Sequence, residues 1–220
     1  MKATAATTRG MRKRERTRGE LVAAAERLVA QRGLDALSID EITEAADVAK
    51  GTFYTHFHDK DDLAAAIGRQ IRLDLEDRIT RMNHGVKNAG VRMANGLATV
   101  LEFAIRQPVR ARAMMRLRPG SVNPDTPINA GIRADILIGQ KAKVFHVPSC
   151  DAAVVVTLGA MMSAVMRLTE SAHPVGNPHE FATDAIAVAL AGLGMKPSEA
   201  QRLARTTMDT RRKDTPDDQG

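Results

Sequence analysis

Residues 37–63 read LSIDEITEAADVAKGTFYTHFHDKDDL, and this stretch decides the fold that we expect for the chain. Ser38 and Glu41 have the spacing of a capping box, which marks the start of a short helix. The pair Asp47-Val48 is the expected turn, and a second short helix follows over residues 49–56. The pattern therefore predicts two short helices joined by a tight turn.

The second short helix has two chemically different faces. Phe53 and Phe57 lie four residues apart and form the expected inward face, whereas the outward positions carry small, basic and hydroxyl side chains. Such a helix, joined to another short helix by a tight turn, is suited to the DNA major groove. We therefore expect the following DNA-binding residues: Thr17, Ser38, Thr43, Ala49, Lys50, Gly51, Thr52, Tyr54, His56 and Lys60.

The outward residues differ in what they can read. Gly51 lets the backbone approach the groove closely, and Lys50 can reach a guanine edge or a phosphate. Thr52 offers a hydroxyl and a methyl group, while Tyr54 suits a phosphate beside the groove. Lys60 stands in the first turn of the next helix, where the helix dipole disfavours a cation. We therefore expect Lys60 to face an external anion. Its loss is expected to weaken binding to all sequences alike.

The charge of the chain is concentrated at its N-terminus. Residues 1–18 carry seven Lys and Arg side chains against one acid, Glu15, so this segment has the net charge of +6 that the whole chain has. A basic segment on a neutral body suggests contact with a polyanion such as DNA, and a solvated tail is the alternative. We expect residues 1–16 to be a flexible arm, with a helix that begins at a Thr17–Glu20 capping box and ends at Gly33.

Helical signals continue along the rest of the chain. Residues 59–82, 91–106, 151–170 and 178–193 carry apolar residues at helical spacing, and Pro or Asn marks several starts. Further helices are expected from Pro108, from Thr126-Pro127 to about Phe145, and from Pro197, with a loop over residues 119–127. The fold class is therefore all-α: a three-helix helix-turn-helix head over residues 17–60, a helical effector-binding and dimerisation domain over 61–210, and a disordered tail over 211–220.

The stretch ITEAADVAKGTFYTHF at residues 42–57, followed by DKDDL at 59–63, resembles the signature of the tetracycline-repressor (TetR) family. The resemblance covers about residues 17–68. It implies an all-helical homodimer, DNA contacts from the head, and a C-terminal domain that binds a small molecule and releases DNA. Three positions depart from the pattern: Asp47 stands where the family often has Gly, Ala49 where it often has a capping Ser or Thr, and Thr43 where it usually has Ala.

The C-terminal half offers two surfaces. Small and apolar residues on the two long helices suggest a two-fold four-helix interface, or alternatively monomer core; these residues are Val155, Gly159, Ser163, Phe181, Ala185, Val188, Ala189 and Gly192. A surplus of methionine suggests core filling or an apolar effector pocket lined by Phe103, Met114, Met115, Phe145, Met161, Met162 and Met166.

Several classes of protein are disfavoured. The single Cys150 excludes an intrachain disulfide framework and fits a reducing cytoplasm. Glu26 and Arg27 interrupt any secretory apolar segment, and the longest uncharged run, residues 152–166, is too short to cross a bilayer. We expect no cofactor, no metal and no enzyme activity. The predicted function is a cytoplasmic repressor that binds a double-stranded DNA operator as a homodimer and responds to an unidentified small-molecule effector. An architectural DNA binder and a small helical enzyme are the alternatives.

Overall fold

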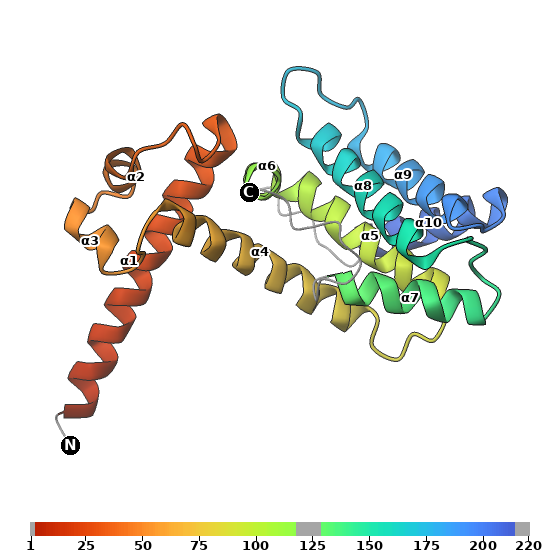
Figure 1. The fold of residues 1–220 in the computed structure, drawn as a ribbon, viewed down its shortest axis with the longest axis horizontal. Coiled ribbons are helices and arrows are strands. Elements are labelled where there is room, and N and C mark those ends of the chain that lie inside the picture. Colours follow the sequence, from red (N-terminus) through yellow and green to blue (C-terminus); the bar gives the residue numbers. More distant parts are fainter. Residues whose placement is uncertain (1–2, 118–128, 214–220) are drawn as a thin grey trace. The chain divides into compact units, whose positions relative to one another are not determined.

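The computed structural model describes residues 3–117 and 129–213, and every regular element in these two ranges is a helix (Figure 1). The chain forms two compact units, one made of Met1–Leu73 with Arg112–Pro119 and the other of Asp74–Ala111 with Gly120–Gly220. The predicted all-α class is confirmed. The sequence-based domain limits stay predictions, as does the loop over residues 119–127, which falls outside the described residues together with the Thr126-Pro127 helix start.

The first unit contains a three-helix head. Helix α1 spans Ala3–Arg32, α2 Ile39–Ala45 and α3 Lys50–Tyr54, and α4, Lys60–Met82, begins in this unit. Helix α2 packs on α1 and on α3. The head is held by a continuous apolar core, since these side chains are fully or almost fully buried: Leu21, Ala25, Val29, Leu37, Ile42, Phe53, Phe57, Leu63, Ile67 and Ile71. Burial of this set stabilises the head because apolar surface leaves water.

The start of α1 differs from the prediction. The helix was expected to begin at Thr17, but Thr17 lies inside α1, and its capping box with Glu20 does not form a helix start. The upstream residues extend the helix because Ala and Arg are strong helix formers even where no apolar periodicity exists. Gly33 ends α1 as expected, with a φ of 80° in the left-handed region.

The second unit is built around one central helix. Helix α5, Ala89–Arg106, packs against α7 (Ala130–Lys141), α8 (Cys150–Thr169), α9 (Pro178–Gly192) and α10 (Pro197–Lys213) (Figure 1). The short α6, Pro108–Arg116, follows α5 and begins at the predicted proline. Twelve residues of α5 are buried, which identifies this helix as the centre of the unit.

The start of α9 agrees with the prediction, because Asn177 caps this helix by accepting a hydrogen bond from the Glu180 N–H. Ser149 caps α8 in the same way, which was not predicted. Helix α7 ends at Lys141, four residues before the expected Phe145, because the chain turns through a left-handed residue at Lys143 with a φ of 56°. Phe145 is nevertheless buried.

The C-terminal prediction is partly wrong. Residues 211–213 were expected in a disordered tail, but they form the last turn of α10, and Arg211 is buried. Within the described ranges, α8 is also the one helix with the length and hydropathy to cross a membrane, although the core helix of a soluble protein meets the same criterion. Its packing against α5, α7 and α9 accounts for the apolar residues on its buried face.

Candidate nucleic-acid interface

Helix α2 is fixed at its start by the predicted capping box. The Ser38 hydroxyl accepts a hydrogen bond from the Glu41 N–H at 3.2 Å, and the Glu41 carboxylate accepts one from the Ser38 N–H at 2.7 Å. Arg32 of α1 lies 2.8 Å from the same carboxylate. The Ser38 N–H, the Ser38 hydroxyl and then Arg32 together lower the pKa of Glu41 to about 2. The capping box therefore stays ionised far below neutral pH.

The turn between α2 and α3 has the predicted left-handed residue. Asp47 has a φ of 53°, and the following Val48 N–H donates to the Thr43 carbonyl at 3.0 Å. Val48 is half-buried between the helices. Ala49 stands at the N-cap of α3 in an extended conformation and provides no side-chain cap, as the sequence predicted. The turn is therefore destabilised at two positions: Asp47 adopts an unfavourable left-handed conformation, and Ala49 lacks a side chain that could cap α3.

Helix α3 separates its inward and outward faces as predicted. Phe53 and Phe57 are buried with ring centroids 5.7 Å apart, whereas Tyr54 is 55% exposed. Lys50 and Gly51 are also exposed, and a Cβ at Gly51 would meet no atom within 4 Å. The outward face of α3 is thus open to a large partner. Thr52 and His56 are half-buried at its margins.

The N-terminal helix contributes to this face in a way that sequence reasoning missed. Arg14 donates a hydrogen bond to the Thr55 carbonyl at 3.2 Å, and the Arg18 guanidinium lies 4.8 Å from the centre of the Phe57 ring. Burial, followed by the charges of Arg14 and Arg18, lowers the pKa of His56. The basic segment of α1 is therefore anchored beside the C-terminal end of α3. Arg14 and Arg18 lie four residues apart in the sequence, and this spacing could have indicated that both point to the same side of a helix.

Two predicted contact residues, Thr43 and Lys60, have other partners in the structure. Thr43 is 3% exposed, and its hydroxyl donates to the Ile39 and Asp40 carbonyls, so its prediction as a DNA contact is wrong. Lys60 donates to the Leu37 carbonyl at 2.5 Å and approaches that of Leu34 at 3.5 Å. The Leu37 and Leu34 carbonyls therefore explain the lysine at position 60 without an external anion.

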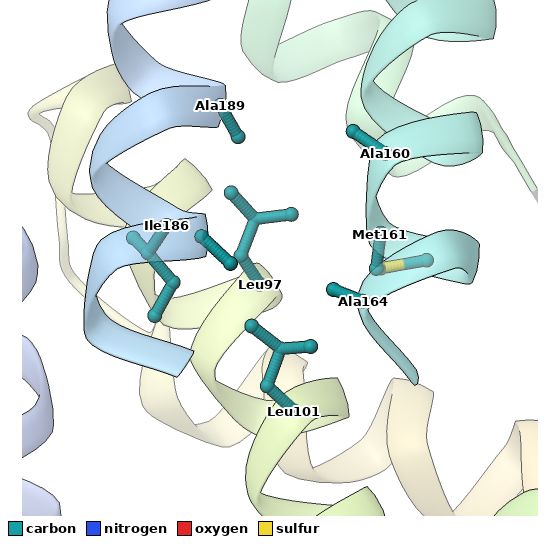
Figure 2. Close-up of a pocket in the computed structure, with 8 residues that line it drawn as sticks. Leu97, Leu101, Ala160, Met161, Ala164, Ile186 and Ala189 are labelled. Atoms are coloured by element: carbon teal, nitrogen blue, oxygen red, sulfur yellow. The ribbon is translucent and has the colours of Figure 1, made fainter. Parts of the chain in front are cut away.

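The predicted pocket residues are divided between the two units and differ in burial. Phe103 and Phe145 are core residues, and Phe145 packs so closely on Gly139 that a Cβ there would lie 2.1 Å from its ring. Met166 is 59% exposed, and Met114 and Met115 belong to the other unit. A partly open apolar hollow with about 210 Å³ of free space, solvent included, lies among α5, α8 and α9. Figure 2 shows its lining: Leu97, Leu101, Ala160, Met161, Ala164, Ala185, Ile186 and Ala189.

The predicted dimer residues include several exposed apolar side chains. Val188 of α9 is 71% exposed, and Val155 of α8 is 39% exposed. Val156 of α8, which sequence reasoning left out, is 67% exposed. These valines lie on two helices that pack against each other, and the part of the chain that the structure describes leaves them exposed to water.

Comparison with known proteins places this geometry in a family. Residues 21–67, which cover most of the head, match the family model "Bacterial regulatory proteins, tetR family". The head is therefore a domain of the tetR family of bacterial regulatory proteins. Helix α2, the Asp47 turn and α3 form its helix-turn-helix, which is the DNA-binding part of such a regulator.

Solved structures of low sequence identity share the fold. RolR in complex with resorcinol is 23% identical, with a TM-score of 0.58, over 88% of this chain and 95% of RolR. A gamma-butyrolactone receptor (ArpA-like protein) is 18% identical, with a TM-score of 0.68, over 90% of this chain and 98% of the receptor. CprB from S. coelicolor A3(2) is 20% identical, with a TM-score of 0.67 and the same two coverages. The similarity of fold therefore extends over both units of the chain.

Proposed function

We propose that this chain is a homodimeric repressor that binds a palindromic operator through the outward face of α3 and leaves it when a small effector binds the second unit. The observation that carries the proposal is the open face formed by Lys50, Gly51 and Tyr54 on α3, whose other face is held in the core by Phe53, with Phe57 buried just after the helix ends. A rigid helix with exposed polar groups can dock into the major groove without rearrangement.

The basic part of α1 supports phosphate contacts beside the groove. Arg12, Lys13 and Arg16 are exposed on the helix that Arg14 and Arg18 anchor against the α3 end. Cations on a helical segment hold their positions, whereas those of a flexible arm must be ordered on binding. The segment therefore adds affinity for any duplex, and α3 adds the choice of sequence.

The exposed valines of α8 and α9 support a dimer. A palindromic site needs two heads with fixed spacing, and a second copy of the chain would cover Val155, Val156 and Val188. We expect Val188→Glu to shift the protein toward monomer in sedimentation, whereas Val109→Glu, on the exposed part of α6, leaves the dimer unchanged. A dimer that survives Val188→Glu would contradict this interface.

The effector class is the least specific part of the proposal. RolR was solved with resorcinol, and two structural neighbours are described as gamma-butyrolactone receptors. Both are small amphipathic molecules, and the apolar lining of the shallow hollow among α5, α8 and α9 would favour such a molecule over a highly charged ligand once the helices open around it. An effector needs only a higher affinity for the arrangement of the two heads that does not fit DNA.

Selection of bound duplexes from a random pool tests the proposal. The expected result is a two-fold symmetric motif with half-sites separated by about one helical turn. Enrichment of no motif would contradict sequence-specific binding, and an enriched motif without symmetry would contradict the dimer. Native mass spectrometry of the purified protein would then look for a retained effector. An architectural DNA binder predicts instead that deletion of residues 1–16 abolishes binding.

A further inference from the structure

The first residue of the recognition helix is held by an acid from the helix before it. The Lys50 ammonium lies 2.9 Å from Oδ1 and 3.0 Å from Oδ2 of Asp40, which stands in the first turn of α2. Both side chains remain more than half exposed, at 56% for Lys50 and 67% for Asp40. A carboxylate therefore lies beside the residue with which we expect the protein to read DNA.

Folding alone gives little reason for this pair. An ion pair between two exposed side chains contributes little to stability, because water screens it and both side chains lose freedom. A carboxylate near a phosphate backbone, by contrast, is repelled by every duplex that the protein approaches. The hydrogen bond from Lys50 to Asp40 is also the main reason that the pKa of Lys50 is raised.

Lys50 can exchange its hydrogen bond to Asp40 for one to DNA, and the acceptor differs between operator DNA and DNA without the operator. A duplex without the operator offers a phosphate, and Lys50 must leave Asp40 unpaired beside the negatively charged backbone to reach it. An operator that has a guanine opposite Lys50 offers the N7 and O6 acceptors of the major-groove edge, where the outward face of α3 is already docked. Replacing the Asp40 carboxylate by a DNA acceptor is therefore more favourable for Lys50 on the operator than on a duplex without it.

We propose that Asp40 is a specificity-determining positioning residue, which weakens binding to non-operator DNA more than binding to the operator by holding Lys50 until a base edge replaces it. This inference rests on the proposed function, because it requires a sequence-specific site read by Lys50. It adds a residue outside α3 to those that set the sequence preference. Asp40 acts through Lys50 and need not touch DNA itself.

The test compares Asp40→Asn with the unaltered protein. Asn keeps the shape of Asp and removes its charge. Affinities are measured for the operator selected from a random pool and for a scrambled duplex over a series of salt concentrations. Affinity for the scrambled duplex should rise about threefold, the effect of one unit charge several ångströms from a phosphate in water. Operator affinity should rise less, so the ratio of the two affinities falls, and the salt dependence on scrambled DNA should steepen.

Two further variants separate this mechanism from a general change of charge. Asp35→Asn removes one negative charge from an exposed residue of the loop between α1 and α2, and it should leave the affinity ratio unchanged. In a Lys50→Gln background, Asp40→Asn should no longer alter the ratio, because the residue through which it acts is gone. Thermal melting of each variant checks that the head stays folded at the assay temperature.

Three results would overturn the inference. The first is an unchanged affinity ratio and salt slope in Asp40→Asn, and the second is an equal effect of Asp35→Asn. The third is a loss of operator affinity alone, which would make Asp40 a direct base contact. These failures are distinct from failure of the proposed function, in which the unaltered protein would select no motif at all.

Discussion

The Arg211 guanidinium lies 3.2 Å from the Glu102 carboxylate, and it joins the last turn of α10 to the middle of α5 across 109 residues of sequence. The same guanidinium donates to the Asn95 carbonyl and to the Thr99 hydroxyl, both at 2.8 Å. Both members of the ion pair are largely buried, with 9% and 13% of their side chains exposed. The C-terminal end of α10 is therefore an integral part of the second unit.

Removal of this guanidinium is expected to destabilise the second unit. Arg211→Ala should lower the free energy of unfolding by about 2–4 kcal/mol, because Glu102 would keep a buried charge without its ion-pair partner. The measurement is urea unfolding followed by circular dichroism. Arg212→Ala, the exposed neighbour, should change the value by less than about 0.5 kcal/mol. Equal effects of the two substitutions would contradict the role of the buried pair.

Lys60 is expected to stabilise the head. Lys60→Met retains the aliphatic stem and removes the donor to the Leu37 and Leu34 carbonyls, so the free energy of unfolding should fall by about 1 kcal/mol. Lys13→Met, at an exposed position of α1, is the matched control and should have no measurable effect. If both variants unfold like the unaltered protein, the carbonyl contacts do not stabilise the loop. DNA titration of Lys60→Met also tests the predicted uniform loss of affinity.

The turn residue Asp47 gives a prediction in the stabilising direction. Because its φ is 53°, Asp47→Gly removes a steric cost of up to about 1 kcal/mol and should raise the melting temperature. Glu44→Gly, in the helical part of α2, should lower the melting temperature, since Gly is unfavourable in a helix. An unchanged or lower melting temperature for Asp47→Gly would show that the left-handed turn is not strained.

The capping box of α2 predicts a pH dependence. The pKa of Glu41 is lowered from its ordinary value of 4.5 to about 2, so the unfolded chain takes up the proton first as the pH falls. The stabilisation by ionised Glu41 is therefore complete above about pH 4.5 and is lost as the pH falls toward 2. The difference in melting temperature between the unaltered protein and Glu41→Gln should shrink over that interval. A difference that stays constant from pH 6 to pH 2 would contradict the capping role.

Local signals explain why much of the head was predictable. The capping box at Ser38, the left-handed turn at Asp47 and the buried pair Phe53 and Phe57 all depend on residues within a few positions of one another. The same holds for Ser149 and Asn177, which cap α8 and α9. Capping and turn chemistry act over three or four residues, so sequence spacing alone indicates them.

The missed features depend on contacts between distant segments or on the rotation of a helix. Arg211 meets Glu102 only after α10 packs on α5, and Lys60 reaches the carbonyls before α2 only once α4 is in place. Thr43 is buried because its hydroxyl turns back onto its own helix, a choice that the residue type leaves open. The N-terminal extension of α1 depends on helix propensity, and its residues show no apolar periodicity that would indicate a helix.

The ratio of operator affinity to scrambled-duplex affinity tests the central claim most directly, namely that the outward face of α3 chooses the DNA sequence. It is measured for Lys50→Ala, for Thr52→Ala and for a variant without residues 1–16. Each substitution in α3 should reduce the ratio about tenfold or more, the usual effect of losing a base contact. The deletion should weaken both affinities together and flatten their salt dependence. Unchanged ratios in both α3 variants, with binding abolished by the deletion, would contradict the account.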